Sequence, residues 1–542
     1  MTFRFGRGAI SESGKEFKEM SGGRKKVLWV DDEIEYLRSH IMFLETRGYS
    51  VVPVFCGDDA IQIIHQNPKE FDIVLLDEQM PGKGGLTTLE EIKDFIPDLP
   101  VVMVTKSEEE QLMDDALGKK IDGYLTKPVN PSQILLVCKK LLDSKQIISS
   151  QIAQKFIRSY SQNRTALSGH LKAGDWVRMY ENQVYWDLEL EKVEDEGLRQ
   201  TQAGQKSDFN SAFSDFVIDN YARWVKGKGE PPLMSHQVLD KLVFPNIGDG
   251  KKNILMVLSG MRLDQYIGIE QILKKYFNAK HQYFYSILPS SGPFSRSAFF
   301  AGALPLEFAS RHGGLWQEGE EPEMYAYGIE QNLLKEKLIS SGYRIEEKEP
   351  WFTRLTDRLS ALELLNKIDS CKTSELVVFV IDFFDVLLQN STSSSILQEI
   401  TNDESGLRTL TESWFRLSAM LQVLKKLSEM DSRVFLTSDH GSVLCSRGTE
   451  LYGAQGWGKH LRYKFGKEIS SDERTVVFLH DPTHFGIPRF SDDFKCIIAR
   501  ENYYFIHPEK FEHYGKQYKN SFQQGGISLQ EMIMPLGTFE TL

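Results

Sequence analysis

The first part of the chain alternates short β-branched runs with amphipathic helical stretches, and this alternation limits the folds open to it. The runs cover residues 27–30, 51–54, 73–76, 101–104 and 123–126. Between the first two runs, Ile34, Leu37, Ile41 and Leu44 recur at the spacing of one helix face. Five alternating units predict an α/β domain over residues 24–144, with a parallel, doubly wound sheet covered by helices on both faces.

Four of the five predicted strands end in polar residues. Asp31 and Asp32 follow the first strand, Asp77 the third, Thr105 the fourth and Lys127 the fifth. In a parallel sheet of this kind, ligands bind at the edge where the strands end. We therefore expect these side chains to meet in one site.

The acidic residues of this set are suited to a divalent cation that assists phosphoryl transfer to a carboxylate. Mg²⁺ prefers oxygen ligands, which Asp31, Asp32, Asp77 and the backbone carbonyl of Gln79 would supply, with Asp31 acting through water. We predict Asp77 as the phospho-acceptor.

The remaining residues of the set are suited to a switch. Lys127 would place a cation opposite the acyl phosphate, and Thr105 would donate a hydroxyl hydrogen bond to it. Tyr124, three residues before Lys127, would turn inward when Thr105 is drawn toward the phosphate. We predict these three residues as the signalling switch.

Residues 25–144 closely resemble the receiver domains of two-component response regulators, which have a flavodoxin-like fold. The resemblance includes the segments at 80–82 (Met-Pro-Gly) and 126–128 (Thr-Lys-Pro). It implies a sensor histidine kinase as partner and a homodimer that forms on phosphorylation. Two residues depart from the usual pattern: Glu78 follows the acceptor, and Lys106 follows Thr105.

Three further regions are expected outside the first domain. Residues 1–23 mix Gly, Ser and charge without periodicity and are predicted to be a flexible leader. Residues 145–245 are predicted to be a helical connector, with a polar inter-helix loop at 193–208. Residues 250–542 are predicted to form a larger α/β domain with strands at 253–258, 376–381 and 434–437.

The last half of the chain resembles the PglZ-type branch of the alkaline phosphatase superfamily. The motifs that carry the resemblance lie at 258–264 (Leu-Ser-Gly-Met-Arg-Leu-Asp), 287–289 (Ile-Leu-Pro), 299–302 (Phe-Phe-Ala-Gly), 437–441 (Thr-Ser-Asp-His-Gly) and 525–529 (Gly-Gly-Ile-Ser-Leu). Joined to a receiver domain, such a domain is similar to PorX-type regulators of type IX secretion. Within the first motif, we expect Arg262 and Asp264 to form an internal ion pair.

The resemblance implies two zinc ions and a Thr or Ser nucleophile, but several of these positions are replaced. Asp385, Asp439 and His440 match the family's metal ligands. The other positions carry Ser259 for an aspartate, Gly292 for the nucleophile, and Gln389 and Gln524 for histidines. Glutamine cannot replace an imidazole nitrogen for zinc, so we predict a pseudo-phosphatase with no two-zinc centre.

An active enzyme is the alternative: a zinc-dependent phosphodiesterase or phosphatase switched by the receiver domain. It would require a shifted loop, with Ser290 or Ser291 as nucleophile. It would also need other ligands from His460, His480 or His484.

A basic cluster formed by Lys459, Arg462 and Lys464 follows the Asp-His pair. Its composition is typical of a strip that faces a phosphate or nucleotide, and a solvated surface is the competing interpretation. With a pseudo-phosphatase, we expect the C-terminal domain to act by binding a protein or a nucleotide-like ligand.

The composition disfavours several other classes of protein. A net charge of −12 and no visible helix-turn-helix argue against a DNA-binding protein. No apolar run reaches the ~18–20 residues that a membrane span needs, so we expect a cytoplasmic protein. The five cysteines are scattered and never form a C-x-x-C pair, which disfavours a disulfide framework or a thiolate zinc site.

Overall fold

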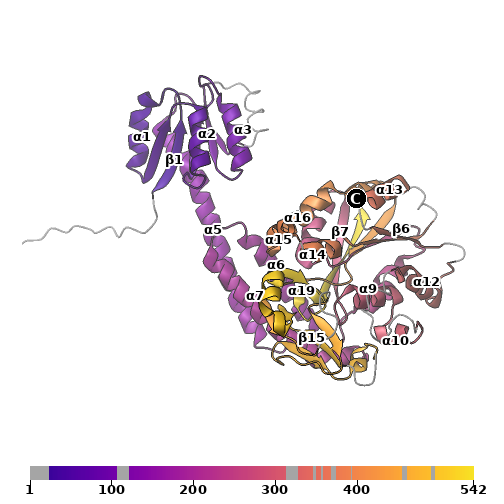
Figure 1. The fold of residues 1–542 in the computed structure, drawn as a ribbon. Helices are drawn as coiled ribbons and strands as arrows, with labels where there is room; N and C mark the ends of the chain where they lie inside the picture. The colour runs from indigo at the N-terminus through magenta and orange to yellow at the C-terminus, as the bar shows by residue number, and fades with distance from the viewer. Residues whose placement is uncertain are drawn as a thin grey trace, which may run out of the picture. The chain divides into compact units, whose positions relative to one another are not determined.

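The computed structural model describes residues 24–106, 121–312, 328–345, 349–355, 358–367, 374–391, 394–453, 460–489 and 495–542. These residues belong to two compact units, Met1–Lys155 and Phe156–Leu542 (Figure 1). The predicted leader at 1–23 lies outside the described residues. Each unit has its own sheet, and each is described by itself below.

The first unit is built on a five-stranded parallel sheet, as predicted. Its strands are β1 (Lys25–Val30), β2 (Tyr49–Val54), β3 (Ile73–Asp77), β4 (Val101–Thr105) and β5 (Gly123–Thr126), in the order β2-β1-β3-β4-β5. This is the strand order of flavodoxin-like sheets. All five predicted runs are strands.

Helices cover both faces of this sheet because side chains alternate along each strand. Leu28 and Val30 pack on one face with α2 (Gly57–Gln66) and α3 (Gly85–Phe95). Val27 and Trp29 pack on the other with α1 (Arg38–Glu45) and α5 (Pro131–Leu167). Figure 1 shows α1 on the opposite side of the sheet from α2 and α3. The predicted helix that begins near Ile34 starts as a short 3₁₀ turn (Ile34–Leu37) before α1.

The connector is helical, but its predicted polar loop is wrong. Helices α5, α6 (Ala173–Leu190) and α7 (Glu196–Trp224) follow one another, and α7 runs through most of residues 193–208. Asp195 starts α7 by accepting a hydrogen bond from the backbone N–H of Leu198 at 3.0 Å. Most of the polar residues in this stretch are exposed on α7, and the buried Gln202 side chain donates to the Gln183 carbonyl at 3.1 Å. The division between the two units falls within α5.

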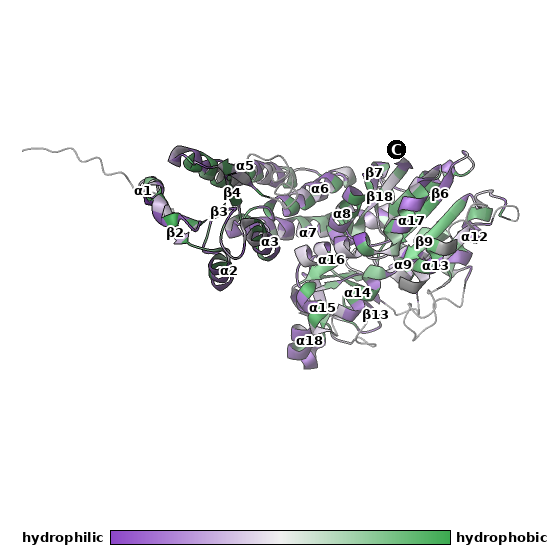
Figure 2. Cartoon of the chain, turned by 90° about the horizontal axis from the view of Figure 1, so that it is seen from above, coloured by the Kyte–Doolittle hydropathy of each residue, from purple (hydrophilic) through white to green (hydrophobic). Residues whose placement is uncertain are grey.

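The second unit is built on a six-stranded mixed sheet in the order β7-β18-β10-β6-β9-β8. Its strands are β6 (Lys252–Leu258), β7 (Phe277–Tyr285), β8 (Trp351–Leu355), β9 (Leu376–Ile381), β10 (Ser432–Thr437) and β18 (Ile533–Thr541). Strands β10, β6, β9 and β8 are parallel, while β18 is antiparallel to both neighbours. Figure 2 shows the hydrophobic character of β6 and β9, which are buried along almost their whole length. The three strands predicted here are β6, β9 and β10.

Helices α8 (Leu263–Leu273), α9 (Gly292–Ala301), α12 (Glu330–Ser340), α14 (Phe383–Ser391), α16 (Glu404–Leu417) and α17 (Ala419–Ser428) belong to this unit. Beyond the main sheet, the described residues of this unit form three smaller sheets. They are β11 (Val443–Cys445) with β17 (Ser521–Gln523), β12 (Arg447–Glu450) with β16 (Tyr503–Ile506), and β15 (Lys495–Ala499) between β13 (Tyr463–Gly466) and β14 (Val476–Leu479).

Helices α6 and α7 share the hydrophobic core of this sheet. Several hydrogen bonds also join α7 to the α/β domain. The Tyr221 hydroxyl accepts from the Leu288 N–H at 2.8 Å, and the Ser214 hydroxyl donates to the Ile527 carbonyl at 3.1 Å. The Asn210 side chain accepts from the backbone N–H of Leu529 at 2.9 Å. The connector helices α6 and α7 are therefore part of the C-terminal fold.

A chain of alternating charges also crosses this contact. In order, it consists of Glu191, Arg408, Asp264, Arg262, Glu404, Lys206 and Asp187. The predicted pair is present: Arg262 Nε lies 2.9 Å from Asp264 Oδ1. Burial raises the pKa of Glu404, but Lys206 and Arg262 outweigh it and hold that pKa below its usual range. Each charge is compensated by its neighbours, so losing one leaves buried charges unpaired.

Replacing Lys206 with methionine should therefore destabilise the protein. The change leaves Asp187 and Glu404 without their shared cation, and a broken buried pair costs about 3–5 kcal/mol. Urea unfolding followed by circular dichroism should show a clearly lower midpoint for Lys206→Met. The control is Lys192→Met, because Lys192 pairs with Glu189 on the same connector while remaining mostly exposed, and it should leave the midpoint unchanged. Equal midpoints for the two variants would contradict the importance of the chain of charges.

Candidate functional site

The carboxyl edge of the first sheet holds an acidic site. Asp31 follows β1 and Asp77 ends β3, and these strands are neighbours in the sheet. Ligand oxygens of Asp31, Asp32 and Asp77 all lie within 4.8 Å of one another. Asp31 and Asp77 are buried while Asp32 is exposed, which leaves one side open. Three carboxylates at this spacing fit a hard cation such as Mg²⁺, which prefers oxygen ligands and keeps several waters.

Lys127 supplies the cation of this site. Its Nζ lies 2.8 Å from Asp77 Oδ2 and 2.9 Å from Asp31 Oδ2. Burial raises the pKa of Asp77 above its usual value, although Lys127 opposes the shift. Burial lowers the pKa of Lys127, but the hydrogen bonds to Asp77 and Asp31 outweigh it, and the net shift is upward. The amine therefore stays protonated beside the buried carboxylates.

The other residues predicted for this site lie around it. The backbone N–H of Gln79 bonds to the Asp77 carboxylate, and the Gln79 side chain is exposed. The Thr105 hydroxyl donates to the carboxylate of Glu78, a contact that the sequence did not indicate. Tyr124 is 48% exposed, so about half of this residue faces solvent.

A second polar centre lies at the carboxyl edge of the larger sheet. The parallel strands β9, β6 and β10 are adjacent, so the residues that follow them meet at one edge. Asp382 follows β9, Ser259 follows β6, and Asp439 and His440 come two and three residues after β10, all of them buried. Asp385 joins them from the first turn of α14. The structure thus brings together the three retained residues and three of the four replaced positions, namely Ser259, Gly292 and Gln524.

The cation at the heart of this centre is Arg296, which sequence reasoning missed. It projects from α9 and is 3% exposed. Its Nη1 donates to Ser259 Oγ at 2.9 Å and lies 3.3 Å from Asp382 Oδ1 and 3.4 Å from Asp385 Oδ2. A signal was available in the sequence, because a lone arginine in an apolar helix has to be paired once it is buried.

More carboxylates complete the surroundings of Arg296. Its Nε lies 3.0 Å from Glu330 Oε1, while Arg354 binds Asp382 from the other side. Burial lowers the pKa of Arg296, but Asp439 and the nearer carboxylates outweigh it and raise that pKa. The guanidinium is therefore permanently charged and is paired with several carboxylates.

Gly292, at the expected nucleophile position, lies directly against this guanidinium. A Cβ added at Gly292 would sit 3.1 Å from Arg296 Nη2. Gly260 is packed as closely, because its φ is +81° and an added Cβ would lie 3.0 Å from Asp385 Oδ1. The loops after β6 and before α9 thus close around the guanidinium.

His440 is held by carboxylates and by one of the glutamines. Its Nδ1 lies 2.9 Å from Asp439 Oδ2, its Nε2 lies 3.6 Å from Asp385 Oδ1, and Nε2 also contacts Gln524 Oε1. Burial lowers the pKa of His440, but Asp439 and Asp385 outweigh it and raise the pKa to about 10. Without a metal the imidazole is therefore protonated at neutral pH, and a zinc ion would have to displace a proton to bind it.

These residues do not fit a two-zinc centre. Within the described ranges, only Asp31, Asp32 and Asp77 gather three potential ligand atoms in one place. Gln389 is exposed on α14, and the side-chain oxygen of Gln524 is directed at His440. Catalytic zinc normally takes about three protein ligands, including nitrogen or sulfur donors.

The serines and histidines considered as nucleophile and zinc ligands of an active enzyme lie in different environments. Ser290 is buried and donates to the Gly526 carbonyl at 2.7 Å, while Ser291 is buried with no hydrogen-bond partner among the described residues. The His460 ring stacks on Tyr463 at a centroid distance of 4.6 Å. His480 and His484 are exposed.

Arg462 of the basic cluster is turned into the protein and does not face a phosphate site. Arg462 is fully buried, pairs with Glu531 at 2.6 Å, and also donates to backbone carbonyls of residues 500, 501 and 503. Its guanidinium supports the fold, because a buried arginine needs its donors satisfied by protein groups. Lys464 is buried in β13, and Lys459 lies outside the described residues.

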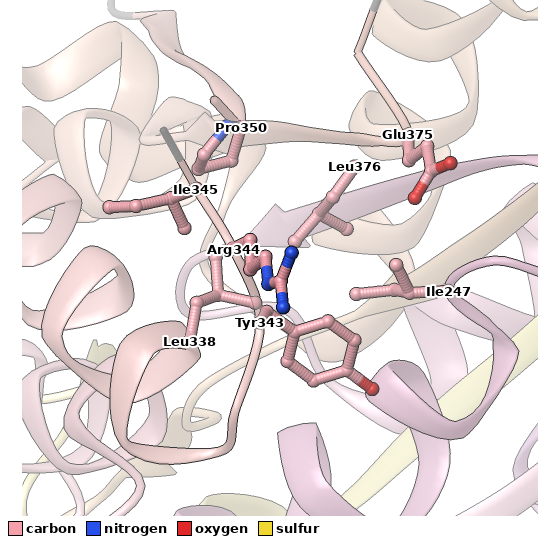
Figure 3. A pocket seen from close by; sticks show the side chains of 8 residues that line it. All are labelled: Ile247, Leu338, Tyr343, Arg344, Ile345, Pro350, Glu375 and Leu376. Atoms are coloured by element: carbon pink, nitrogen blue, oxygen red, sulfur yellow. The ribbon is translucent and has the colours of Figure 1, made fainter. Parts of the chain in front are cut away.

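A hollow of about 220 Å³ lies elsewhere in this unit, as Figure 3 shows. Apolar side chains and Arg344 line it, with Glu375 and Leu376 on one wall. Leu376 begins β9, so the hollow lies at the amino end of the strand whose carboxyl end leads to Asp382. It is therefore separate from the Arg296 centre and lies away from the edge where such sheets carry their chemistry.

Comparisons with known proteins match each part of the chain. The family model of the response regulator receiver domain matches residues 27–139, and that of the PorX response regulator linker domain matches residues 146–225. The model of the BREX system PglZ alkaline phosphatase-like domain matches residues 238–539.

Individual relatives resemble the first domain. The transcriptional regulatory protein BaeR of Escherichia coli is 35% identical over 119 residues, which are 22% of this chain and 48% of that protein. The response regulator GacA of Pseudomonas aeruginosa is 32% identical over 133 residues, or 24% and 61% of the two chains. This chain thus spans about half to three fifths of these relatives. Among solved structures, the CheX-CheY-BeF3-Mg complex of Borrelia burgdorferi matches with a TM-score of 0.22 and 26% identity, over 22% of this chain and 91% of that one.

The five-stranded sheet and the receiver match define the protein as a response regulator. The PglZ match covers more than half of the chain, so the chain belongs to the PglZ alkaline phosphatase-like family. With receiver, PorX linker and PglZ parts in one chain, it is a PorX-type two-component response regulator. None of the helices in the described ranges has the length and apolar character of a membrane span.

His440 should be an imidazolium near neutral pH. Because Asp439 and Asp385 raise its pKa to about 10, both ring nitrogens should carry protons at pH 8 and lose one only near pH 10. Nitrogen-15 NMR of histidine-labelled protein in metal-free buffer checks this, with His440→Gln identifying the signal. A neutral ring at pH 8 would contradict the charge balance described above.

Proposed function

We propose that this chain is a phosphorylation-switched cytoplasmic regulator whose PglZ-type domain is a pseudo-phosphatase and acts by binding. The observation that carries the proposal is the contact of Arg296 with Ser259, Asp382 and Asp385. A fixed guanidinium there takes the carboxylates that a metal would need, and Gly292 beside it has no hydroxyl for attack on phosphorus.

In the receiver domain, an Asp77 carboxylate oxygen attacks the phosphorus of the donor. The new oxygen–phosphorus bond forms as the bond from phosphorus to the histidine nitrogen of a sensor kinase breaks. Mg²⁺ held by Asp31, Asp32, Asp77 and the Gln79 carbonyl would neutralise the charge of the reacting groups. Lys127, already beside Asp77, then pairs with the acyl phosphate.

The signal passes from the acyl phosphate to a dimer. Thr105 turns its hydroxyl toward the phosphate, Tyr124 moves inward from its exposed position, and the altered face of β5 pairs with a second copy. Helix α7 contacts Leu288, which lies shortly before Gly292 in the chain. It also contacts Ile527 and Leu529, which follow Gln524. A displacement of the connector would therefore also displace residues of the PglZ-type domain.

In this proposal the C-terminal domain binds a protein or a nucleotide-like ligand and does not hydrolyse it. Asp439 and His440 serve as a buried ion pair, because the protonated imidazole compensates Asp439 and Asp385. The likeness to PorX-type regulators supports a role in the control of type IX secretion.

A zinc-dependent phosphodiesterase is the second candidate, and one observation favours it. Asp385 Oδ1, both carboxylate oxygens of Asp439 and the Ser291 hydroxyl are buried without a hydrogen-bond partner among the described residues. Buried polar atoms usually have partners, and a metal ion would satisfy these oxygens. The charges of Arg296 and His440 compensate the same carboxylates without a metal.

Asp77→Asn should abolish phosphorylation by acetyl phosphate, because an amide oxygen is too poor a nucleophile to accept the group. In wild type, beryllofluoride with Mg²⁺ should raise the dimer fraction measured by light scattering at micromolar protein, and Asp77→Asn should stay monomeric. Label retained on Asp77→Asn would show that the acceptor lies elsewhere. An unchanged wild-type mass would refute the dimer switch.

Purified protein should contain no two-zinc centre and should not hydrolyse a chromogenic phosphodiester. Elemental analysis after incubation with zinc and gel filtration checks the metal content, and the assay is run with and without beryllofluoride. The combined variant Ser259→Asp, Gly292→Thr, Gln389→His and Gln524→His is the positive control for a rebuilt site, since a partly rebuilt site gains little. Near two zinc ions per wild-type chain, with hydrolysis that EDTA and Asp439→Ala remove, would establish the phosphodiesterase instead.

A further inference from the structure

The residue that follows the predicted acceptor is bonded to the switch threonine. The Thr105 hydroxyl donates to the Glu78 carboxylate, and both side chains are half-buried. The strand register explains why they meet. Asp77 pairs with Val104 between β3 and β4, so the next residue on each strand, Glu78 and Thr105, lies at the same level.

The backbone of Glu78 is hydrogen-bonded to both β4 and α3. Its N–H donates to the Val104 carbonyl at 2.9 Å, and its carbonyl accepts from the Gly85 N–H at 2.9 Å. An added Cβ at Gly85 would lie 2.8 Å from the Glu78 Cα, so α3 begins directly against this residue. The carboxylate of Glu78 is thereby fixed beside Thr105.

We propose that Glu78 is a positioning residue that holds Thr105 in the unphosphorylated arrangement. It thereby sets how readily the receiver domain switches when Asp77 is phosphorylated. The inference rests on the proposed role of Asp77 as acceptor. Thr105 has one hydroxyl proton, so it cannot donate fully to Glu78 and to an acyl phosphate at once. A bond to an ionised carboxylate is stronger than one between neutral groups, so releasing Thr105 costs free energy.

The neighbouring strand is consistent with a held Thr105. Thr105 pairs with Thr126 between β4 and β5, and Tyr124 lies two residues before Thr126. The Tyr124 ring is about half exposed while Glu78 holds the hydroxyl. Glu78 thus stabilises the unphosphorylated arrangement, which both Thr105 and Tyr124 must leave. A phosphate mimic shifts the equilibrium only if it binds the switched arrangement more tightly.

The test is the affinity of the full chain for beryllofluoride in Mg²⁺ buffer, measured by titration calorimetry. Glu78→Ala removes the acceptor for Thr105 and should lower the half-saturating concentration about tenfold, as loss of one charge-assisted hydrogen bond predicts. Glu78→Gln retains a neutral acceptor of the same size and should fall between Glu78→Ala and wild type. Near-ultraviolet circular dichroism confirms that each variant is folded.

Removing a negative charge beside Asp77 would also favour an anion directly, and a double-mutant cycle separates the two causes. In a Thr105→Ala background there is no hydroxyl to hold, so Glu78→Ala should change the affinity less than twofold. A tenfold gain that persists in Thr105→Ala would overturn the positioning role, as would no gain in the single variant. If wild type fails to bind beryllofluoride, or Asp77→Asn binds it equally well, the assignment of Asp77 fails instead.

Discussion

The second unit depends on the burial of one guanidinium among carboxylates. Asp382, Asp385 and Glu330 gather because three elements converge at one edge, and their like charges would repel one another without Arg296. An unpaired buried charge is costly, so the cation and the carboxylates require each other. The short contacts of Gly260 and Gly292 with this centre follow from the same need for close approach. The fold of a phosphatase-like domain is thus compatible with a centre built from protein charges.

Both domains bury carboxylates of like charge at the edge of a sheet, and they compensate these charges in opposite ways. Each sheet places carboxylates after its parallel strands, and in each domain basic side chains compensate them. Lys127 is 15% exposed and lies beside an open acidic site, so it can exchange a carboxylate for a phosphate. Arg296 is 3% exposed and bonded on several sides, so it is locked in place. The first arrangement suits a switch and the second a fixed scaffold.

Much of the receiver domain was predictable because its chemistry follows the strand ends, which hydrophobic periodicity locates. The larger domain was harder, since only three strands of its six-stranded main sheet were predicted and the partners of its charges were not visible in the sequence. Arg296 lies on α9, far in sequence from Asp382 and Asp385, and only the folded chain brings them together. Arg462 was misread because its buried partner, Glu531, is 69 residues away. The loop predicted at 193–208 was wrong since polarity alone does not show that Gln202 is bonded inside a helix.

Zinc-edge anomalous diffraction from crystals grown with zinc would show whether Arg296 or a metal ion compensates the carboxylates of the second unit, because it locates each metal and each side chain together. The pseudo-phosphatase hypothesis predicts no anomalous peak within bonding distance of Asp385, Asp439 or His440. It also predicts density for Arg296 on Ser259 and the two aspartates, as in the structure. A zinc peak coordinated by Asp439 and His440, with the Arg296 guanidinium displaced from Ser259, would contradict it.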